Sequence, residues 1–459
     1  MPRTAKSPEE MLASFVAKLS YEALPKVALE RSKNAILDTI GVALAGSQED
    51  TGKIPLRVLA ELGGKPVASV IAGKCQTSPV FAAMANGTSA HALDYDDVND
   101  SWIGHPSTVL VPAILAVAES GKYSGRDVLT AYNAGLEVGA KLGIVFGQDQ
   151  YARGWHTTGS IGSVAGAAAV ARLLNLSERQ TQMAMGIAAS ASGGLRENFG
   201  SMTKPLHAGS AASTAVLAGL LAKRGFTSSD NALMAKSGYG RVLGKDTDYD
   251  AVPTFRKLGK PLDIVANGIW VKAYPSGAAT HSAISAALNL RGKRSFKVQD
   301  IQVIECATNK AIPQILIHHQ PRSGLEGKFS IEYCVAVALL DGEVTLDQFT
   351  DKRALSKDVQ SLVSKVKYTH PKEMEDKFGF HIPGLITVRL KNGKTISSRV
   401  ASPKGTPENP MTTEELHAKF ERCSRAVLTV RERTRVIKLV SKLEEAKSVK
   451  GLMKVLSGD

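Results

Sequence analysis

The chain has 459 residues, which is more than one hydrophobic core usually sustains, so two or three domains are expected. Its composition, 43% hydrophobic and 22% charged, is that of a globular protein and excludes disordered and fibrous classes. Four widely spaced cysteines offer neither a disulfide framework nor the ligands of an iron–sulfur cluster. No apolar run reaches the roughly 18 residues of a membrane span, and residues 1–20 lack a signal-peptide core. A cytoplasmic protein without a membrane partner is expected.

The formal charge of +14 raises nucleic acid as a possible partner. Part of the excess is concentrated near the C-terminus, in Arg425, Arg431, Arg433, Arg435, Lys438, Lys442, Lys447, Lys450 and Lys454. No zinc finger, RNP motif or interleaved aromatic residues accompany these side chains. We therefore expect a solvated helix face and no nucleic-acid partner, and a basic protein also suits an anionic substrate. A basic scaffold or nucleic-acid-binding module is the alternative outside enzymology.

The first two hundred or so residues have the pattern of packed helices. Residues 8–60 are predicted to be helical, with Ser7 as the first N-cap and Glu10 as its capping-box partner. From about residue 80 to 225, alanine-rich periodic stretches recur, such as VLVPAILAVAES, GSVAGAAAVARLLNL and STAVLAGLLAKRG. Small residues let helices approach closely, so this part is predicted to form a compact all-α domain.

The pattern changes near residue 270. VQDIQVIECAT is typical of a strand, and KFSIEYCVAVALLDG of a buried helix. Asn392-Gly393 between two alternating segments predicts a hairpin. A linker rich in proline and glycine follows, and then a helix with Thr412 and Glu415 as its capping box. The prediction is a mainly α protein, with a helical domain at 1–267, an α+β insertion at 268–407 and a helical return at 408–459.

The segment HALDYDDVNDSWIGHPSTVL, residues 91–110, holds four aspartates. Asp96, Asp97 and Asp100 satisfy the D-D-x-x-D spacing with which some helical enzymes hold magnesium. Such a site needs a second acidic cluster on a facing helix, and the sequence contains none. We therefore predict no metal site here.

Basic and hydroxyl side chains recur at four predicted helix entrances, in GHPS, RGWHTTG, SMTKPLH and KAYPS. A helix N-terminus offers free N–H groups to an anion. Four such entrances predict the walls of one pocket for a multiply charged anion. The candidate residues are His105, His156, Lys204, His207, Lys272 and Ser276, with His281 further along the last helix; a structural role is the alternative for His207 and His281.

Together, TSAHALDYDD, GHPS, GWHTTG, TKPLHAG, YPSGAATH and KFSIEYCVAVALLDG resemble the MmgE/PrpD family, in the same motif order, from about residue 10 to 440. The resemblance implies a large helical domain with an inserted α+β lid, a homodimer, and chemistry without metal or cofactor on a small di- or tricarboxylate. It also implies one of three reactions: dehydration of 2-methylcitrate, decarboxylation of cis-aconitate or epimerisation of iminodisuccinate.

Carried over by position, the resemblance implies catalytic roles for Asp94, His105, His156, Lys204 and Tyr333, with Lys272, Ser276, His207 and His281 binding substrate. The lysines could clamp carboxylates or act as a base, and either His105 or His156 could transfer the proton. Asp94 could orient a histidine, and Tyr333 could protonate a leaving hydroxyl. A buried helix tyrosine with a satisfied hydroxyl is the alternative for Tyr333.

Two positions depart from the family pattern. Val98 stands where a threonine often follows the acidic motif, and Gly277 stands where the decarboxylase branch has a histidine. The loss of both polar groups argues against decarboxylation. We therefore expect a hydro-lyase like 2-methylcitrate dehydratase, with an epimerase, an isomerase or a decarboxylase of a related dicarboxylate as the alternative, and the sequence does not identify the substrate.

Overall fold

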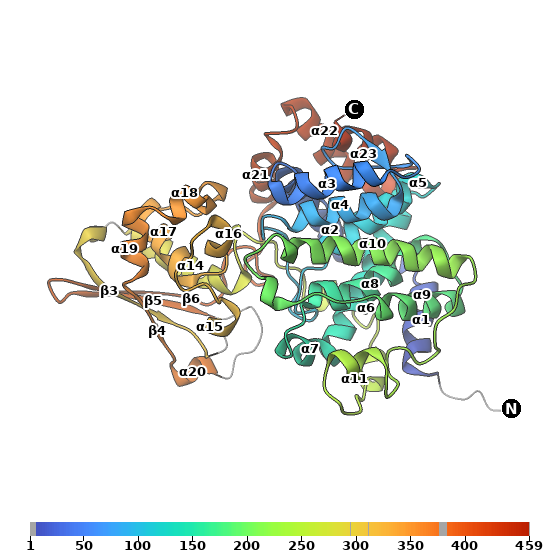
Figure 1. Cartoon of the computed structure of the whole chain (residues 1–459), viewed down its shortest axis with the longest axis horizontal. Helices are drawn as coiled ribbons and strands as arrows, with labels where there is room; N and C mark the ends of the chain where they lie inside the picture. The colour runs from blue at the N-terminus through green and yellow to red at the C-terminus, as the bar shows by residue number, and fades with distance from the viewer. Residues whose placement is uncertain (1–5, 294, 311, 376–382, 459) are drawn as a thin grey trace.

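The computed structural model describes residues 6–293, 295–310, 312–375 and 383–458, and it is mainly α-helical. Figure 1 shows two lobes side by side. We call residues 6–266 and 413–457 the helical lobe, and residues 278–400, as far as they are described, the sheet lobe. The domain boundaries expected from the sequence stay predictions.

The helical lobe begins with helices that the sequence predicted. The capping box of Ser7 and Glu10 on the first helix is confirmed, and so is that of Thr412 and Glu415 on the returning helix. The larger helices are α1 (Pro8–Lys18), α2 (Lys26–Gly46), α3 (Asp50–Leu62), α4 (Pro79–His91), α5 (Ser107–Ser120), α6 (Gly125–Leu142), α8 (Thr157–Leu173), α9 (Glu178–Ser190), α10 (Thr203–Lys223), α21 (Thr413–Ser424), α22 (Val430–Ser441) and α23 (Lys450–Ser457). The short segments are α7 (Gln148–Ala152), α11 (Tyr239–Leu243), α12 (Val252–Phe255) and α13 (Asp263–Ala266), with a two-stranded pair, β1 (Ala68–Ser69) and β2 (Gln76–Thr77), that the sequence did not predict.

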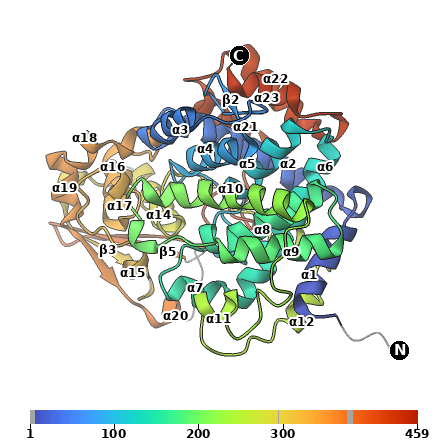
Figure 2. The ribbon, with the colours of Figure 1, turned by 45° about the vertical axis from the view of Figure 1, so that its right-hand side comes forward.

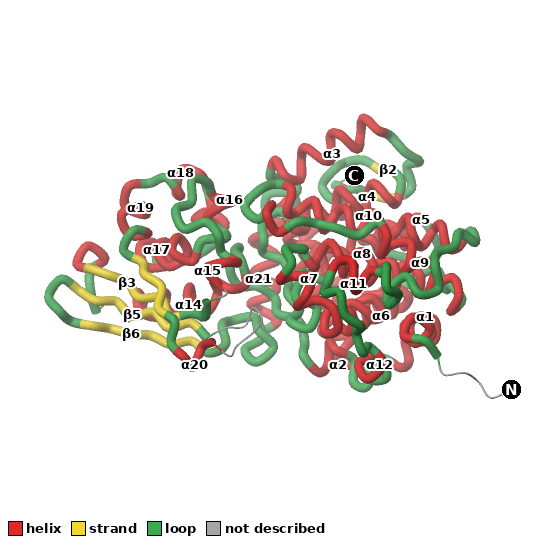
Figure 3. Tube along the Cα trace, turned by 60° about the horizontal axis from the view of Figure 1, so that its bottom comes forward, coloured by secondary structure: helices red, strands yellow, loops and turns green. Residues whose placement is uncertain are grey.

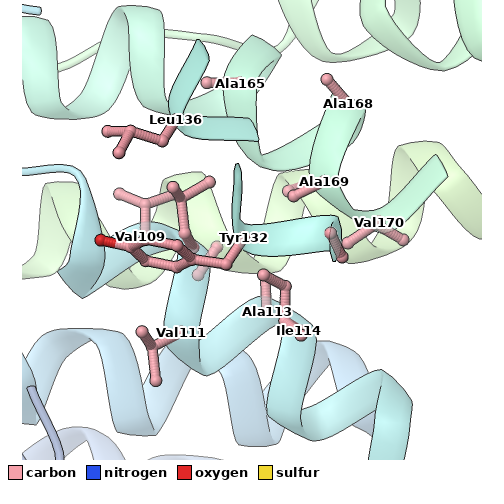
Figure 4. Packing of buried hydrophobic residues seen from close by; sticks show 14 of the residues in the cluster. Val109, Val111, Ala113, Ile114, Tyr132, Leu136, Ala165, Ala168, Ala169 and Val170 are labelled. Carbon is pink, nitrogen blue, oxygen red and sulfur yellow. The ribbon is translucent and has the colours of Figure 1, made fainter. Parts of the chain in front are cut away.

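Small residues bring the central helices together. Helix α10 packs against α4 and α8, as the stacked ribbons show (Figure 1, Figure 2). A Cβ at Gly87 of α4 would lie 3.0 Å from the Cα of Gly209 in α10, so these backbones nearly touch. Figure 4 shows Val109 of α5, Tyr132 of α6 and Ala169 of α8 within the same core. The alanine-rich pattern therefore allows the close packing that positions the ends of α4 and α10.

Among the described residues, α10 is the one helix long and apolar enough by composition to cross a membrane, which the sequence analysis did not anticipate. Most of it is buried inside the protein against α4 and α8. Lys204 in its first turn also faces other side chains of the protein. These features are those of a core helix.

The sheet lobe contains a four-stranded sheet of order β4-β3-β5-β6, with bounds β3 (Ile301–Ala307), β4 (Val366–Thr369), β5 (Gly384–Leu390) and β6 (Thr395–Val400). Strands β3 and β4 are parallel, while β5 is antiparallel to both β3 and β6. The predicted hairpin at Asn392-Gly393 is confirmed, and Gly393 supplies the positive φ of 83°.

Helices pack beside this sheet and complete a second hydrophobic core. They are α14 (His281–Gly292), α17 (Ile331–Asp341) and α19 (Lys357–Val363), and Figure 3 shows them next to the strands. Four short helices lie between these longer elements: α15 (Ile312–Ile315), α16 (Gly324–Gly327), α18 (Asp351–Ala354) and α20 (Lys372–Glu375). The returning residues 416–456 contribute to the helical core, so the chain leaves that core and comes back to it.

Candidate active site

Asp94 lies in the loop between α4 and α5, with its carboxylate between two buried ammonium groups. Lys204 of α10 pairs with one oxygen, and the Nζ of Lys272 lies 3.0 Å from the other. Burial opposes ionisation of Asp94, but the two ammonium groups outweigh it and hold the pKa of this carboxyl well below its usual range. Burial also lowers the pKa of Lys204, and the charge of Asp94 partly offsets this. The chain thus places two cations around one carboxylate.

Asp96 faces two histidines in the same loop region. Its carboxylate lies 2.9 Å from the Nδ1 atoms of both His91 and His105, and the His105 Nδ1 also lies 2.9 Å from the Asp97 carbonyl. Both partners of the His105 Nδ1 are acceptors, so this nitrogen carries the proton and Nε2 keeps a free lone pair. Burial lowers the pKa of His105, against the opposing charge of Asp96, so the ring is neutral at pH 7. This geometry suits a general base.

His156 stands at the entrance of α8, next to the other histidines. Its ring lies 5.6 Å from that of His91, and its Nδ1 lies 3.0 Å from the Nδ1 of His207. Burial and the charge of Lys204 hold the pKa of His156 well below its usual range, and burial lowers that of His207 to about 4. Both rings are therefore neutral at pH 7, and one donates a proton to the other.

A cavity lies between the two lobes, directly against these groups. The helical lobe contributes the polar wall. The sheet lobe and residues 267–277, which we call the connecting segment, contribute an apolar wall. The lining residues are Asp94, Ile103, Gly104, His105, Tyr151, His156, Phe199, Lys204, Gly277, Ala278, Ala279, Ile315, Leu316 and Phe329. Four of the predicted residues, Asp94, His105, His156 and Lys204, therefore share one cavity. Two further predicted residues lie just outside the cavity, each in contact with a lining residue. Lys272 pairs with Asp94, and His207 forms a hydrogen bond with His156.

Three other predicted residues do not line this cavity. The Tyr333 hydroxyl donates to the Gln348 carbonyl inside the core of the sheet lobe, so the expected role as a proton donor to substrate does not fit its position. Ser276 is fully buried with its hydroxyl 2.8 Å from that of Thr280. The His281 Nε2 lies 3.4 Å from the Ser276 carbonyl. These side chains have local partners, which fits a structural role.

The remaining aspartates of the acidic motif point in different directions. Asp97 accepts a hydrogen bond from the Ser107 backbone at the start of α5, and Asp100 is exposed. Two other groups have metal-ligand spacing among the described residues: His91, His105 and His156, and His91, Asp94 and Asp96. The ammonium of Lys204, which pairs with Asp94 and lowers the pKa of His156, opposes a divalent cation at either.

Several residues at the site were missed by the sequence analysis. Asp96 contacts both His91 and His105. His91 and Asp96 both stand in HALDYDD, where their spacing of five residues could have suggested a contact. Ile315, Leu316 and Phe329 form the apolar wall. Nothing in their local pattern distinguishes them from core residues, because their place depends on how the lobes meet.

Comparison with known proteins finds matches over most of the chain. The chain matches the model of the MmgE/PrpD N-terminal domain at residues 10–252 and that of the C-terminal domain at residues 274–445. It is 28% identical to human cis-aconitate decarboxylase, over 99% of this chain and 95% of the relative. A cis-aconitate decarboxylase-like protein of Aspergillus oryzae is 29% identical, over 98% and 97%. The 2-methylcitrate dehydratase of Cupriavidus necator is 26% identical, over 85% and 84%.

Proposed function

The chain belongs to the MmgE/PrpD family, and from that premise we propose that it is a lyase acting on a small di- or tricarboxylate, specifically a hydro-lyase of the 2-methylcitrate dehydratase type. The observation that carries the proposal is the pairing of buried ammonium groups with neutral imidazoles around one cavity. The ammonium groups favour an anion, and the imidazoles accept protons.

The proposed reaction removes a proton next to a carboxylate. The free Nε2 of His105 takes this proton, and Asp96 stabilises the imidazolium that forms. Lys204 contacts a substrate carboxylate and stabilises the negative charge that develops on it, while Lys272 and Asp94 hold the ammonium in place. The carbon–oxygen bond then breaks, and the hydroxyl leaves as water.

The proton for the leaving hydroxyl needs a donor other than Tyr333. Tyr151 lines the cavity, and burial raises the pKa of its hydroxyl to about 12, so it is protonated at pH 7. We assign it this role. His156 is the other candidate donor. Its ring is neutral without substrate, but the negative charge of a bound substrate raises its pKa and so favours the protonated form.

Decarboxylation of cis-aconitate is the second candidate, because the decarboxylase relatives are similar over almost their full length. The surroundings of Gly277 favour the hydro-lyase instead. A Cβ at Gly277 would lie 3.2 Å from the Leu316 Cδ2 and 3.3 Å from the Lys328 carbonyl oxygen. A side chain at position 277 would therefore fit only if Leu316 or the Lys328 carbonyl shifted by a few tenths of an ångström.

The test is incubation with a panel of hydroxylated and unsaturated tricarboxylates, including 2-methylcitrate and cis-aconitate, with and without EDTA. We expect absorbance of a new C=C bond from 2-methylcitrate, no CO2, and the same rate with the chelator. Release of CO2 from cis-aconitate would make the protein a decarboxylase. Solvent deuterium uptake without absorbance change would indicate an epimerase. No reaction with any acid of the panel, together with salt-sensitive DNA binding, would favour a basic scaffold. Loss of activity in EDTA that a metal restores would contradict metal-independent chemistry.

A further inference from the structure

Three consecutive backbone carbonyls around Asp94 each accept a hydrogen bond from a different buried lysine. The Leu93 carbonyl accepts from Lys328 at 2.7 Å, the Asp94 carbonyl from Lys272 at 2.8 Å, and the Tyr95 carbonyl from Lys419 at 2.8 Å. The lysines come from the sheet lobe, from the connecting segment and from α21 of the helical lobe. Parts of the chain that are distant in sequence therefore converge on one turn of backbone.

The turn has a conformation that needs such support. Asp94 has a φ of 52°, in the left-handed region that non-glycine residues seldom adopt. Aspartate adopts this region more readily than most side chains, but the conformation is still less favourable than the extended or right-handed one. Charge-assisted hydrogen bonds to the carbonyls before, at and after the residue fix the peptide planes on both sides. The direction of the Asp94 carboxylate, and with it the positions of Lys204 and Lys272, depends on them.

Lys328 differs from the other two lysines. Lys272 pairs with Asp94, and Lys419 with Asp38 at 2.7 Å, whereas no ion pair of Lys328 occurs within the part of the chain that the structure describes. Lys328 is 4% exposed, and its Nζ lies 4.8 Å from the centre of the Phe349 ring. Burying an ammonium without a carboxylate partner is costly, so hydrophobic packing does not account for this lysine.

The second acceptor of Lys328 shows what this ammonium connects. Its Nζ lies 3.1 Å from the Pro275 carbonyl, two residues before Gly277 in the cavity wall. The same Nζ also holds Leu93, which precedes Asp94 in the opposite wall. One buried ammonium from the sheet lobe thus ties the Asp94 turn to the segment that carries the apolar wall.

We propose that Lys328 is a positioning residue, which acts through the Leu93 and Pro275 carbonyls to hold Asp94 and its two lysines in the arrangement that the reaction needs. The inference rests on the proposed function for its kinetic effect. It extends that function by making the sheet lobe responsible for the geometry of a turn in the helical lobe. Lys419 supports the next carbonyl in the same way.

The variant Lys328→Met removes the ammonium and keeps most of the side-chain volume. We expect kcat to fall at least tenfold with KM within about threefold, because Lys328 does not touch the cavity. The melting temperature should change little, because removal of a buried charge without an ion-pair partner offsets the loss of its two hydrogen bonds. Lys352→Met, at an exposed lysine of the same lobe, is the matched control and should leave both quantities unchanged. A kcat within twofold of wild type, or a loss that only follows a lower melting temperature, would overturn the proposal.

Two further measurements separate this proposal from the proposed function. In Lys328→Ala, which leaves room for a small amine, added ethylammonium should restore part of kcat, while Lys328→Met should not respond. A crystal structure of Lys328→Met decides the case even if wild type proves inactive on every acid in the panel. We expect Asp94 to leave the left-handed region or to lose its contact with Lys204. An unchanged Asp94 with both lysine contacts intact would contradict the positioning role.

Discussion

Asp94 shows how a single buried carboxylate can organise a site. It pairs with both ammonium groups at once and can neutralise only one of them, so an anionic substrate can take over part of the pairing with Lys204. The site is therefore poised for a ligand that brings its own negative charge. Nearby imidazoles are neutral because they are buried, and that same ligand raises their pKa values and makes them better bases.

At this scale the first prediction concerns Lys204→Met. If the ammonium stabilises charge that develops in the transition state, its loss should lower kcat/KM a hundredfold or more, which is about 2.7–4 kcal/mol. Because Asp94 keeps Lys272 as a partner, the melting temperature should change little. Lys223→Met, at the exposed far end of the same helix, is the control. Kinetics within threefold of wild type would remove Lys204 from the site.

Asp97 gives a second prediction, which concerns stability. Burial raises the pKa of this carboxyl to about 8, from an ordinary value of 3.8, although its contacts with Ser107 oppose the shift. A raised pKa in the folded state means that the stability present below about pH 4 is lost as pH rises toward 8. The side chain of Asp97→Asn does not titrate, so the variant should become more stable relative to wild type as pH rises from 5 to 8. The difference in the free energy of unfolding should grow by up to about 1.4 kcal/mol per pH unit, and melting curves across this pH range measure it. A difference that is constant with pH would show that Asp97 is ionised in the folded protein.

At the scale of elements, local signals predicted where helices begin but not what their side chains meet. Ser7 and Thr412 cap helices through residues three positions away, and such contacts can be read from the sequence. The partner of Tyr333 is the Gln348 carbonyl, which depends on how α17 packs in the sheet lobe. The motif SIEY therefore identified the helix correctly and gave the tyrosine a role that its position does not support.

Helix α21 supplies a third prediction, because it is tied to α2 by a buried ion pair. The Lys419 Nζ lies 2.7 Å from Asp38 Oδ1, and both side chains are 1% exposed. Lys419→Met leaves a buried carboxylate without its partner and should cost about 3–5 kcal/mol. Adding Asp38→Asn removes that charge and should restore most of the loss, as a double-mutant cycle of melting or urea midpoints can measure. Additive losses in the double variant would mean that the two groups do not interact.

For the whole molecule, the site could be predicted only in part because it lies between lobes. The helix entrances of the polar wall carry their chemistry in short motifs around His105, His156 and Lys204. The apolar wall belongs to the sheet lobe, and its contribution depends on the tertiary arrangement of the two lobes. The homodimer that the resemblance implies stays a prediction, which sedimentation equilibrium can test.

The arrangement of the lobes leads to the last prediction. The proposed tricarboxylate substrate would contact Lys204 on one side of the cavity and residues near Gly277 on the other, so it should stabilise both lobes together. At a concentration a hundred times its Kd, a ligand that binds only the folded state adds about 2.7 kcal/mol to stability. Citrate and tricarballylate should therefore raise the melting temperature and bring any separate transitions of the lobes together in calorimetry. Sodium chloride at equal ionic strength is the control, because a chain with a net charge of +14 responds to any anion. The shift should be absent in Lys204→Met and present in Lys223→Met; an equal shift in both variants would mean that the anions bind elsewhere on the basic surface.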